Sequence, residues 1–90
     1  MVPLYSAGFN KTCLHLPQHI ASKALIAAGR FAGHDPEIWR QTKRIKKLTD
    51  YYRIRIHCDY RLLLHWQAGK ELTILEIIPR QELENWINRH

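Results

Sequence analysis

The residues best suited to chemistry lie in one basic run near the middle of the chain. Eight of the fourteen Lys and Arg residues fall within positions 40–61, and in the densest part, YYRIRIHCDYR, apolar and cationic side chains alternate. Successive side chains of a strand point to opposite faces of a sheet. The run therefore predicts a strand whose Arg53, Arg55 and His57 share one open face that could bind phosphate groups. Ile54 and Cys58 would lie on the other, buried face.

The segments before this run are expected to form the first strand and the helices that cover the buried face of the sheet. Residues 1–8 are expected to form a first strand at a sheet edge, because Pro3 lacks the amide that a central strand needs. Apolar residues at helical spacing then predict two helical pieces, of which the longer spans residues 17–32. Pro17 suits the first turn of that helix and Gly33 its exit.

A third helix is expected to begin after Asp35, a favourable N-cap residue followed by Pro36. The spacing of Ile38, Ile45 and Leu48 extends this helix to Leu48. Its outer face would carry a basic group consisting of Arg40, Lys43, Arg44, Lys46 and Lys47. We interpret this group as binding RNA backbone without sequence preference, with an ordinary solvated helix face as the alternative.

The period of the apolar residues changes to two after residue 50. Strands are expected at residues 53–58, 60–67 and 71–79, and their short connections imply an antiparallel meander. A final helix should run from about Gln81 to the terminus. The sequence thus predicts a single α+β domain over residues 1–90, with an N-terminal strand and helices packed on an antiparallel sheet in the order β-α-α-β-β-β-α.

Composition narrows the class of partner. A formal net charge of +6 and an isoelectric point near 9.7 favour a polyanion, either nucleic acid or an acidic protein. No apolar stretch is long enough for a bilayer, so no membrane partner is expected. Two cysteines without a secretory signal indicate reduced thiols and a cytoplasmic protein. Neither cysteine spacing suggests zinc, and Pro17 separates His15 from His19, so no metal and no cofactor are expected.

The order of elements, together with four segments, resembles the RelE/ParE superfamily of toxins from bacterial type II toxin-antitoxin systems. The segments are DPEIW, KKL, RIRIHCDYRLLL and IIPRQELENW, and the resemblance runs from about Phe9 to Trp86. It implies a cognate antitoxin as partner. RelE-type members are mRNA interferases that enter the ribosomal A site and cut the translated messenger RNA, whereas ParE-type members poison DNA gyrase. Both types share one fold.

The resemblance to the RelE-type ribonucleases also implies roles for particular residues. Arg53 and Arg55 match the paired basic residues of the first meander strand, and Arg61 matches the Arg that follows the Tyr of the second strand. Arg80 matches the Arg after the last strand. Trp86 lies where RelE-type members often have Tyr, so it is interpreted as a base-stacking residue or, alternatively, as a core anchor.

Cleavage of RNA without a metal uses the adjacent 2′-hydroxyl as nucleophile. The protein must help to remove its proton, stabilise a phosphorane-like transition state and protonate the leaving oxygen. Arg61 and Arg80 are expected to hold the transition state through their planar donors, with Arg55 beside them. His57 is the expected base because imidazole titrates near neutrality. The carboxylates of Glu76 and Glu82 are alternatives.

A ribosome-dependent endoribonuclease is the leading hypothesis for the function. Two alternatives are a ParE-type gyrase poison and a non-catalytic relative that binds RNA or an antitoxin. They stay open because Trp86 replaces a Tyr and because the basic strand has arginines where a base could be a lysine. A purely structural interpretation is also open, in which the arginines pair across strands with Asp50 and Asp59.

Overall fold

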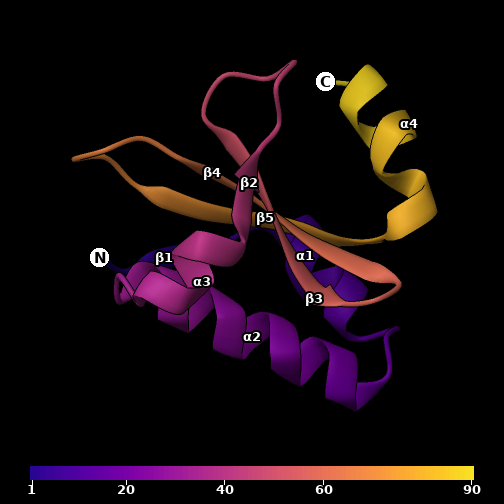
Figure 1. Ribbon diagram of the computed structural model, residues 1–90. Coiled ribbons are helices and arrows are strands. Elements are labelled where there is room, and N and C mark those ends of the chain that lie inside the picture. The colour runs from indigo at the N-terminus through magenta and orange to yellow at the C-terminus, as the bar shows by residue number, and fades with distance from the viewer.

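The computed structural model describes residues 1–90 as a mixed sheet with helices on both of its faces (Figure 1). The elements in chain order are β1 (Pro3–Tyr5), α1 (Ala7–Cys13), α2 (Gln18–Ala32), α3 (Pro36–Gln41), β2 (Thr42–Arg44), β3 (Tyr51–His57), β4 (Tyr60–Trp66), β5 (Leu72–Pro79), a 3-10 turn η1 (Arg80–Glu82) and α4 (Leu83–Asn88). The predicted α+β fold class is therefore confirmed, with one strand more than expected.

The five strands are arranged in the order β1-β5-β4-β3-β2. β3, β4 and β5 form the predicted antiparallel meander. β1 pairs parallel with β5 and lies at one edge, as Pro3 indicated, while β2 pairs antiparallel with β3 at the other edge. The first strand is shorter than predicted because Ser6 caps α1: its hydroxyl accepts a hydrogen bond from the Phe9 N–H at 3.0 Å. Gly8 consequently lies inside a helix.

The main core lies between the sheet and the first three helices. α2 buries residues at helical spacing, with Ile20, Ala24 and Ala28 at most 1% exposed, against strand residues such as Ile54 and Leu62. The small alanines let the helix axis approach the sheet closely. α2 ends at Gly33, as the sequence predicts. No helix in the structure is both long enough and apolar enough to cross a bilayer.

A smaller second core covers the opposite face of the sheet. It consists of Ile45, Leu63, Ile78 and Trp86, and it attaches α4 to the sheet. Leu63 is fully buried here, while its neighbours Leu62 and Leu64 face the main core. The central strand β4 is therefore apolar on both faces, which is why LLL interrupts the expected alternation.

The prediction that the third helix continues to Leu48 is wrong, because α3 ends at Gln41. Thr42 adopts an extended backbone, its hydroxyl donates to the Ile38 carbonyl at 2.8 Å, and β2 then pairs with β3. The helical spacing of Ile38 and Ile45 misled the prediction because these residues are buried in different cores on opposite faces of the sheet. Only Arg40 of the predicted basic group lies in a helix. Lys43 and Arg44 belong to β2, and Lys46 and Lys47 to the following turn.

The predicted cap of α3 is confirmed. The Asp35 carboxylate accepts a hydrogen bond from the Glu37 N–H at 2.9 Å and another from Arg30 Nε at 2.7 Å. The bond from Arg30, followed by the one from Glu37, lowers the pKa of Asp35 below its ordinary value. Ionised Asp35 therefore stabilises the fold at pH values above about 3.9, the ordinary value for an unfolded chain.

We expect Asp35→Asn to lower the melting temperature at pH 7, because asparagine keeps the cap and loses the charge that binds Arg30. The difference from the wild type should shrink as the pH falls through the folded-state pKa of Asp35, where the wild-type carboxylate also loses its charge. Thermal unfolding followed by circular dichroism between pH 7 and about pH 2 measures this. A difference that is independent of pH would contradict the assignment.

Candidate nucleic-acid interface

Four cationic side chains line one hollow on the sheet face that carries α4. Lys43 of β2, Arg53 and Arg55 of β3 and Arg61 of β4 surround it together with Gln41 at the end of α3, and its volume is about 420 Å³. Three adjacent strands thus bring together residues from two separate parts of the sequence. The prediction that Arg53 and Arg55 share an open sheet face is confirmed.

Like charges face each other directly across the strands of this hollow. Lys43 pairs with Arg53 between β2 and β3, and Arg55 pairs with Arg61 between β3 and β4. The only ion pair in the structure is that of Arg30 with Asp35, and neither residue lines the hollow. The interpretation that Asp50 and Asp59 neutralise these arginines is therefore wrong. Directly opposed like charges destabilise a sheet, so the arrangement suits an anionic ligand better than it suits the fold.

Arg61 is the most constrained of these cations. Its Nη1 atom donates to the carbonyls of His57, Cys58 and Tyr60 at 3.0, 3.3 and 3.0 Å. Partial burial lowers the pKa of the Arg61 guanidinium, and the charges of Arg55, Arg80 and Arg53 lower it further. These hydrogen bonds use one nitrogen and leave Nε and Nη2 free. An anchored guanidinium with free donors can bind a phosphate group without first losing side-chain entropy.

Arg80 reaches the same region from the end of β5. Its backbone N–H donates to the Asp59 carbonyl at 2.7 Å, which ties the start of η1 to the turn between β3 and β4. The Arg80 charge lies close enough to lower the pKa of Arg61, although Arg80 does not line the hollow. Arg80 therefore lies near Arg61, and the prediction that both contact one phosphate group stays a prediction.

The cationic surface continues along β2. A second hollow of about 660 Å³ is lined by Lys43, Arg44, Lys46 and Arg53. A third, next to α4, includes Lys47. Arg53 belongs to all three hollows, so they are continuous, and Glu84 at the third is the one acidic residue that lines them. Arg40 is exposed on α3 and lines none of the three.

The predicted position of His57 is wrong. Arg55 pairs with Arg61, but His57 pairs with Tyr60, so a bulge adds one residue to β3 between these pairs. A one-residue shift turns later side chains to the opposite face. His57 consequently faces α2, with its ring centroid 6.2 Å from that of His19. The bulge and turn also leave Cys58 exposed rather than buried.

Trp86 is a core residue, so its predicted role in stacking on RNA bases is wrong. Its side chain is 5% exposed, and His90 covers it with a ring-centroid separation of 4.0 Å. Neither alternative carboxylate lines the hollow: Glu76 accepts a hydrogen bond from Thr12 at 2.6 Å, and Glu82 lies in η1. Gln41 is a lining residue that sequence reasoning missed, because an uncharged residue at a helix end carries no distinguishing signal.

Repulsion in the hollow leads to a prediction about stability. Arg55→Gln should stabilise the protein by about 0.5 kcal/mol in low salt, because it removes one of two opposed like-charge pairs. The gain should largely disappear at about 1 M salt, where screening already weakens the repulsion. Urea unfolding at both salt concentrations measures it. A loss of stability in low salt would mean that Arg55 makes a favourable contact.

Comparison with solved structures finds similar folds. A crystal structure of a RelB-RelE antitoxin-toxin complex from Methanococcus jannaschii contains a chain with a TM-score of 0.72 and 21% identity, and the match covers 92% of this chain and 96% of that one. A YoeB/ParE toxin from Agrobacterium tumefaciens matches with a TM-score of 0.64 and 13% identity, over 89% of this chain and 99% of the toxin. No protein-family model and no curated protein matches the sequence.

The matches extend over nearly the whole chain. They agree with the resemblance seen in the order of elements and in the basic meander. The chain therefore has the fold of the RelE/ParE toxins.

Proposed function

We propose that this protein is the toxin of a type II toxin-antitoxin system and acts in the cytoplasm as a ribosome-dependent endoribonuclease on translated messenger RNA. The observation that carries the proposal is the hollow of opposed, unpaired cations around Arg61. A fold that keeps such repulsion on one face has a surface suited to phosphates. The similarity to RelE and YoeB/ParE toxins supports the same function.

In the proposed reaction, the 2′-hydroxyl of one nucleotide attacks the adjacent phosphorus and the 5′-oxygen of the next nucleotide leaves. The free donors of Arg61 stabilise the charge that develops on the phosphate oxygens, and Arg80 adds a second cation. Arg53, Arg55 and Lys43 bind the flanking phosphates. Arg44, Lys46 and Lys47 extend the contact along β2, towards ribosomal RNA in the proposed complex.

The hollow itself contains no imidazole and no carboxylate, since its lining residues are an amide and four cations. His57 is turned away by the bulge, so the geometry gives it no part in proton transfer. We propose that electrostatic stabilisation and orientation by the arginines are the protein's main contribution. Protons would pass to water or to groups of the ribosomal complex.

The proposed protein partner is an antitoxin that covers the basic surface. One of the similar structures is a complex of a toxin with its antitoxin. A net charge of +6 favours an antitoxin whose covering segment is acidic. A short reading frame of that kind beside this gene would support the pairing.

The test is controlled expression in a bacterium followed by mapping of RNA 5′ ends. We expect cuts inside translated messages, and none in the same messages after their start codons are removed. Expression that leaves every translated message intact would contradict the ribonuclease proposal.

A ParE-type gyrase poison is the second candidate, because no titratable base lines the hollow and Trp86 is buried where a Tyr is often found. It predicts intact RNA, induction of the DNA-damage response and gyrase trapped on DNA. A non-catalytic relative predicts neither effect and no arrest of growth. The same expression experiment therefore separates all three functions.

A further inference from the structure

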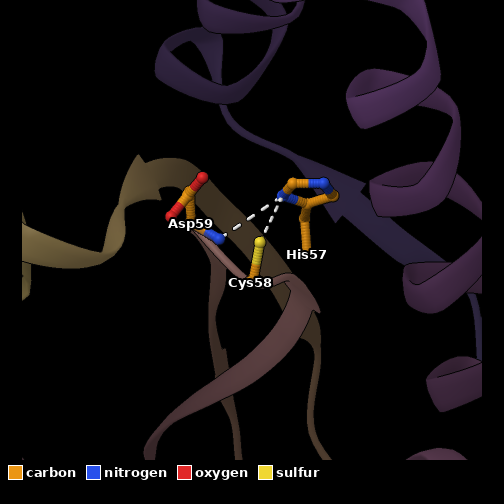
Figure 2. A group of neighbouring side chains, drawn as sticks. All are labelled: His57, Cys58 and Asp59. Carbon is orange, nitrogen blue, oxygen red and sulfur yellow. Dashed lines mark hydrogen bonds between the residues drawn. The ribbon is translucent and has the colours of Figure 1, made fainter.

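Three consecutive side chains with different metal-binding atoms meet at the turn between β3 and β4. His57, Cys58 and Asp59 each offer one ligand atom, and these atoms lie within 4.8 Å of one another. Figure 2 shows the His57 ring and the Cys58 thiol facing each other, with the Asp59 backbone beside them. The Cys58 sulfur lies 3.5 Å from His57 Nδ1. Cys58 and Asp59 are exposed, so an ion could reach the group from solvent.

Neighbouring residues in a regular strand cannot share an ion, because their side chains point to opposite faces. Here the bulge between Arg55 and His57 and the turn at Cys58 and Asp59 bring the side chains together. His57 Nδ1 accepts a weak hydrogen bond from the Asp59 N–H at 3.4 Å, so its lone pair points towards the turn, and a bound ion would replace this bond. The arrangement is therefore a product of the local backbone and was not visible as a sequence spacing.

We propose that this turn binds one Zn²⁺ ion through His57 Nδ1, Cys58 Sγ and an Asp59 carboxylate oxygen. A thiolate, an imidazole and a carboxylate suit zinc, whereas Mg²⁺ and Ca²⁺ prefer oxygen ligands alone. Ligand atoms of a tetrahedral zinc site lie about 3.3–3.8 Å apart. Side-chain rotations that move the three ligand atoms about 1 Å closer together would therefore let them bind one ion. Zinc would replace the thiol proton of Cys58.

His19 supplies the fourth ligand from the first turn of α2. Its ring centroid lies 6.2 Å from that of His57. Two imidazoles bound to one tetrahedral zinc ion have centroids roughly 5 Å apart, so a small rotation of the exposed His19 side chain suffices. This ligand would join the turn to the helix layer, and the ion would then cross-link two elements distant in the chain.

The proposed zinc site is separate from the basic hollow and does not depend on the proposed ribonuclease function. The two are nevertheless adjacent, because the His57 and Cys58 carbonyls accept hydrogen bonds from Arg61. Zinc in the turn would hold these carbonyls in place. It would thereby fix the anchor of Arg61 without contacting RNA.

The experiment is titration of the reduced full-length chain with Zn²⁺ by calorimetry and with Co²⁺ by absorption spectroscopy. We expect one ion per chain and, with Co²⁺, a thiolate-to-metal charge-transfer band. Cys58→Ser should remove the band and weaken Zn²⁺ binding by more than about 100-fold, since losing a direct ligand costs more than losing an outer-shell partner. His57→Ala should weaken binding similarly, and His19→Ala should weaken it less.

Matched controls are Cys13→Ser, which removes the other thiol, and His34→Ala, which removes an exposed histidine at the end of α2. Both should bind Zn²⁺ as the wild type does. The proposal is overturned if the wild type does not bind, if Cys58→Ser binds as tightly as wild type, or if the band disappears in Cys13→Ser instead. Unchanged binding by His19→Ala would overturn the assignment of the fourth ligand.

Discussion

Replacing Arg61 by alanine is expected to lower RNA cleavage in translating cells by about 10²- to 10³-fold, the usual cost of removing one preorganised donor from a developing oxyanion. Arg61 has the only guanidinium in the hollow that is fixed by three backbone carbonyls. The substitution removes charge and orientation together. Arg61→Lys restores charge but has no planar set of donors, so it should recover only part of the activity.

The measurement is the yield of new RNA 5′ ends at equal toxin concentration. Arg30→Ala is the matched control, because Arg30 is also an arginine but binds Asp35 outside the hollow and should keep wild-type cleavage. Circular dichroism of both variants shows whether loss of activity reflects loss of structure. Full cleavage by folded Arg61→Ala would remove Arg61 from the proposed mechanism. Arg80→Ala should also reduce cleavage, through the second cation near Arg61.

Replacing Trp86 by alanine should destabilise the protein by about 3–5 kcal/mol, the usual range for deleting a buried large aromatic side chain. That is a large part of the total stability expected for a small domain. Trp86 is the buried residue of α4, and it packs with Ile45, Leu63 and Ile78 in the second core. The main effect should therefore be the release of α4 from the sheet.

Hydrogen exchange followed by mass spectrometry distinguishes this release from general unfolding. In Trp86→Ala, amides of α4 should exchange rapidly while those of α2 remain protected, because α2 lies on the opposite face of the sheet (Figure 1). Trp39→Ala is a suitable comparison, since Trp39 stacks on Phe31 with ring centroids 4.6 Å apart at the edge of the main core. It should affect α2 and α3 first. Equal loss of protection in both helices of Trp86→Ala would contradict the description of two cores.

Much of the fold could be predicted because α2 and β3 each show the period of one buried face, although β4 is buried on both faces. α2 shows the helical period of its buried side, and the three meander strands follow from the change to a period of two. The prediction failed at residues 42–48 because Ile38, before this segment, and Ile45, within it, belong to different cores. The spacing of apolar residues indicates which residues are buried, but it does not indicate on which face of the sheet they are buried.

Some residues of the candidate site could likewise be predicted from the sequence, and others could not. Arg53 and Arg55 could be placed together from strand alternation alone. Arg80 could not, because its approach to Arg61 depends on the tertiary hydrogen bond to Asp59, and only the family resemblance pointed to it. His57 was misplaced since a bulge has no reliable sequence signal in this run. The proposed zinc ligands had no signal in the sequence for the same reason.

The two edges of the sheet differ in a way that affects solubility. An edge strand has unpaired backbone groups that can pair with another copy and start aggregation. β2 carries exposed Lys43 and Arg44, so two such edges repel each other. β1 contains Pro3 but is flanked by Val2, which is 82% exposed. Lys43, which repels Arg53 within the sheet, thus also helps to protect the β2 edge against self-association. The β1 edge is more open to pairing with another copy.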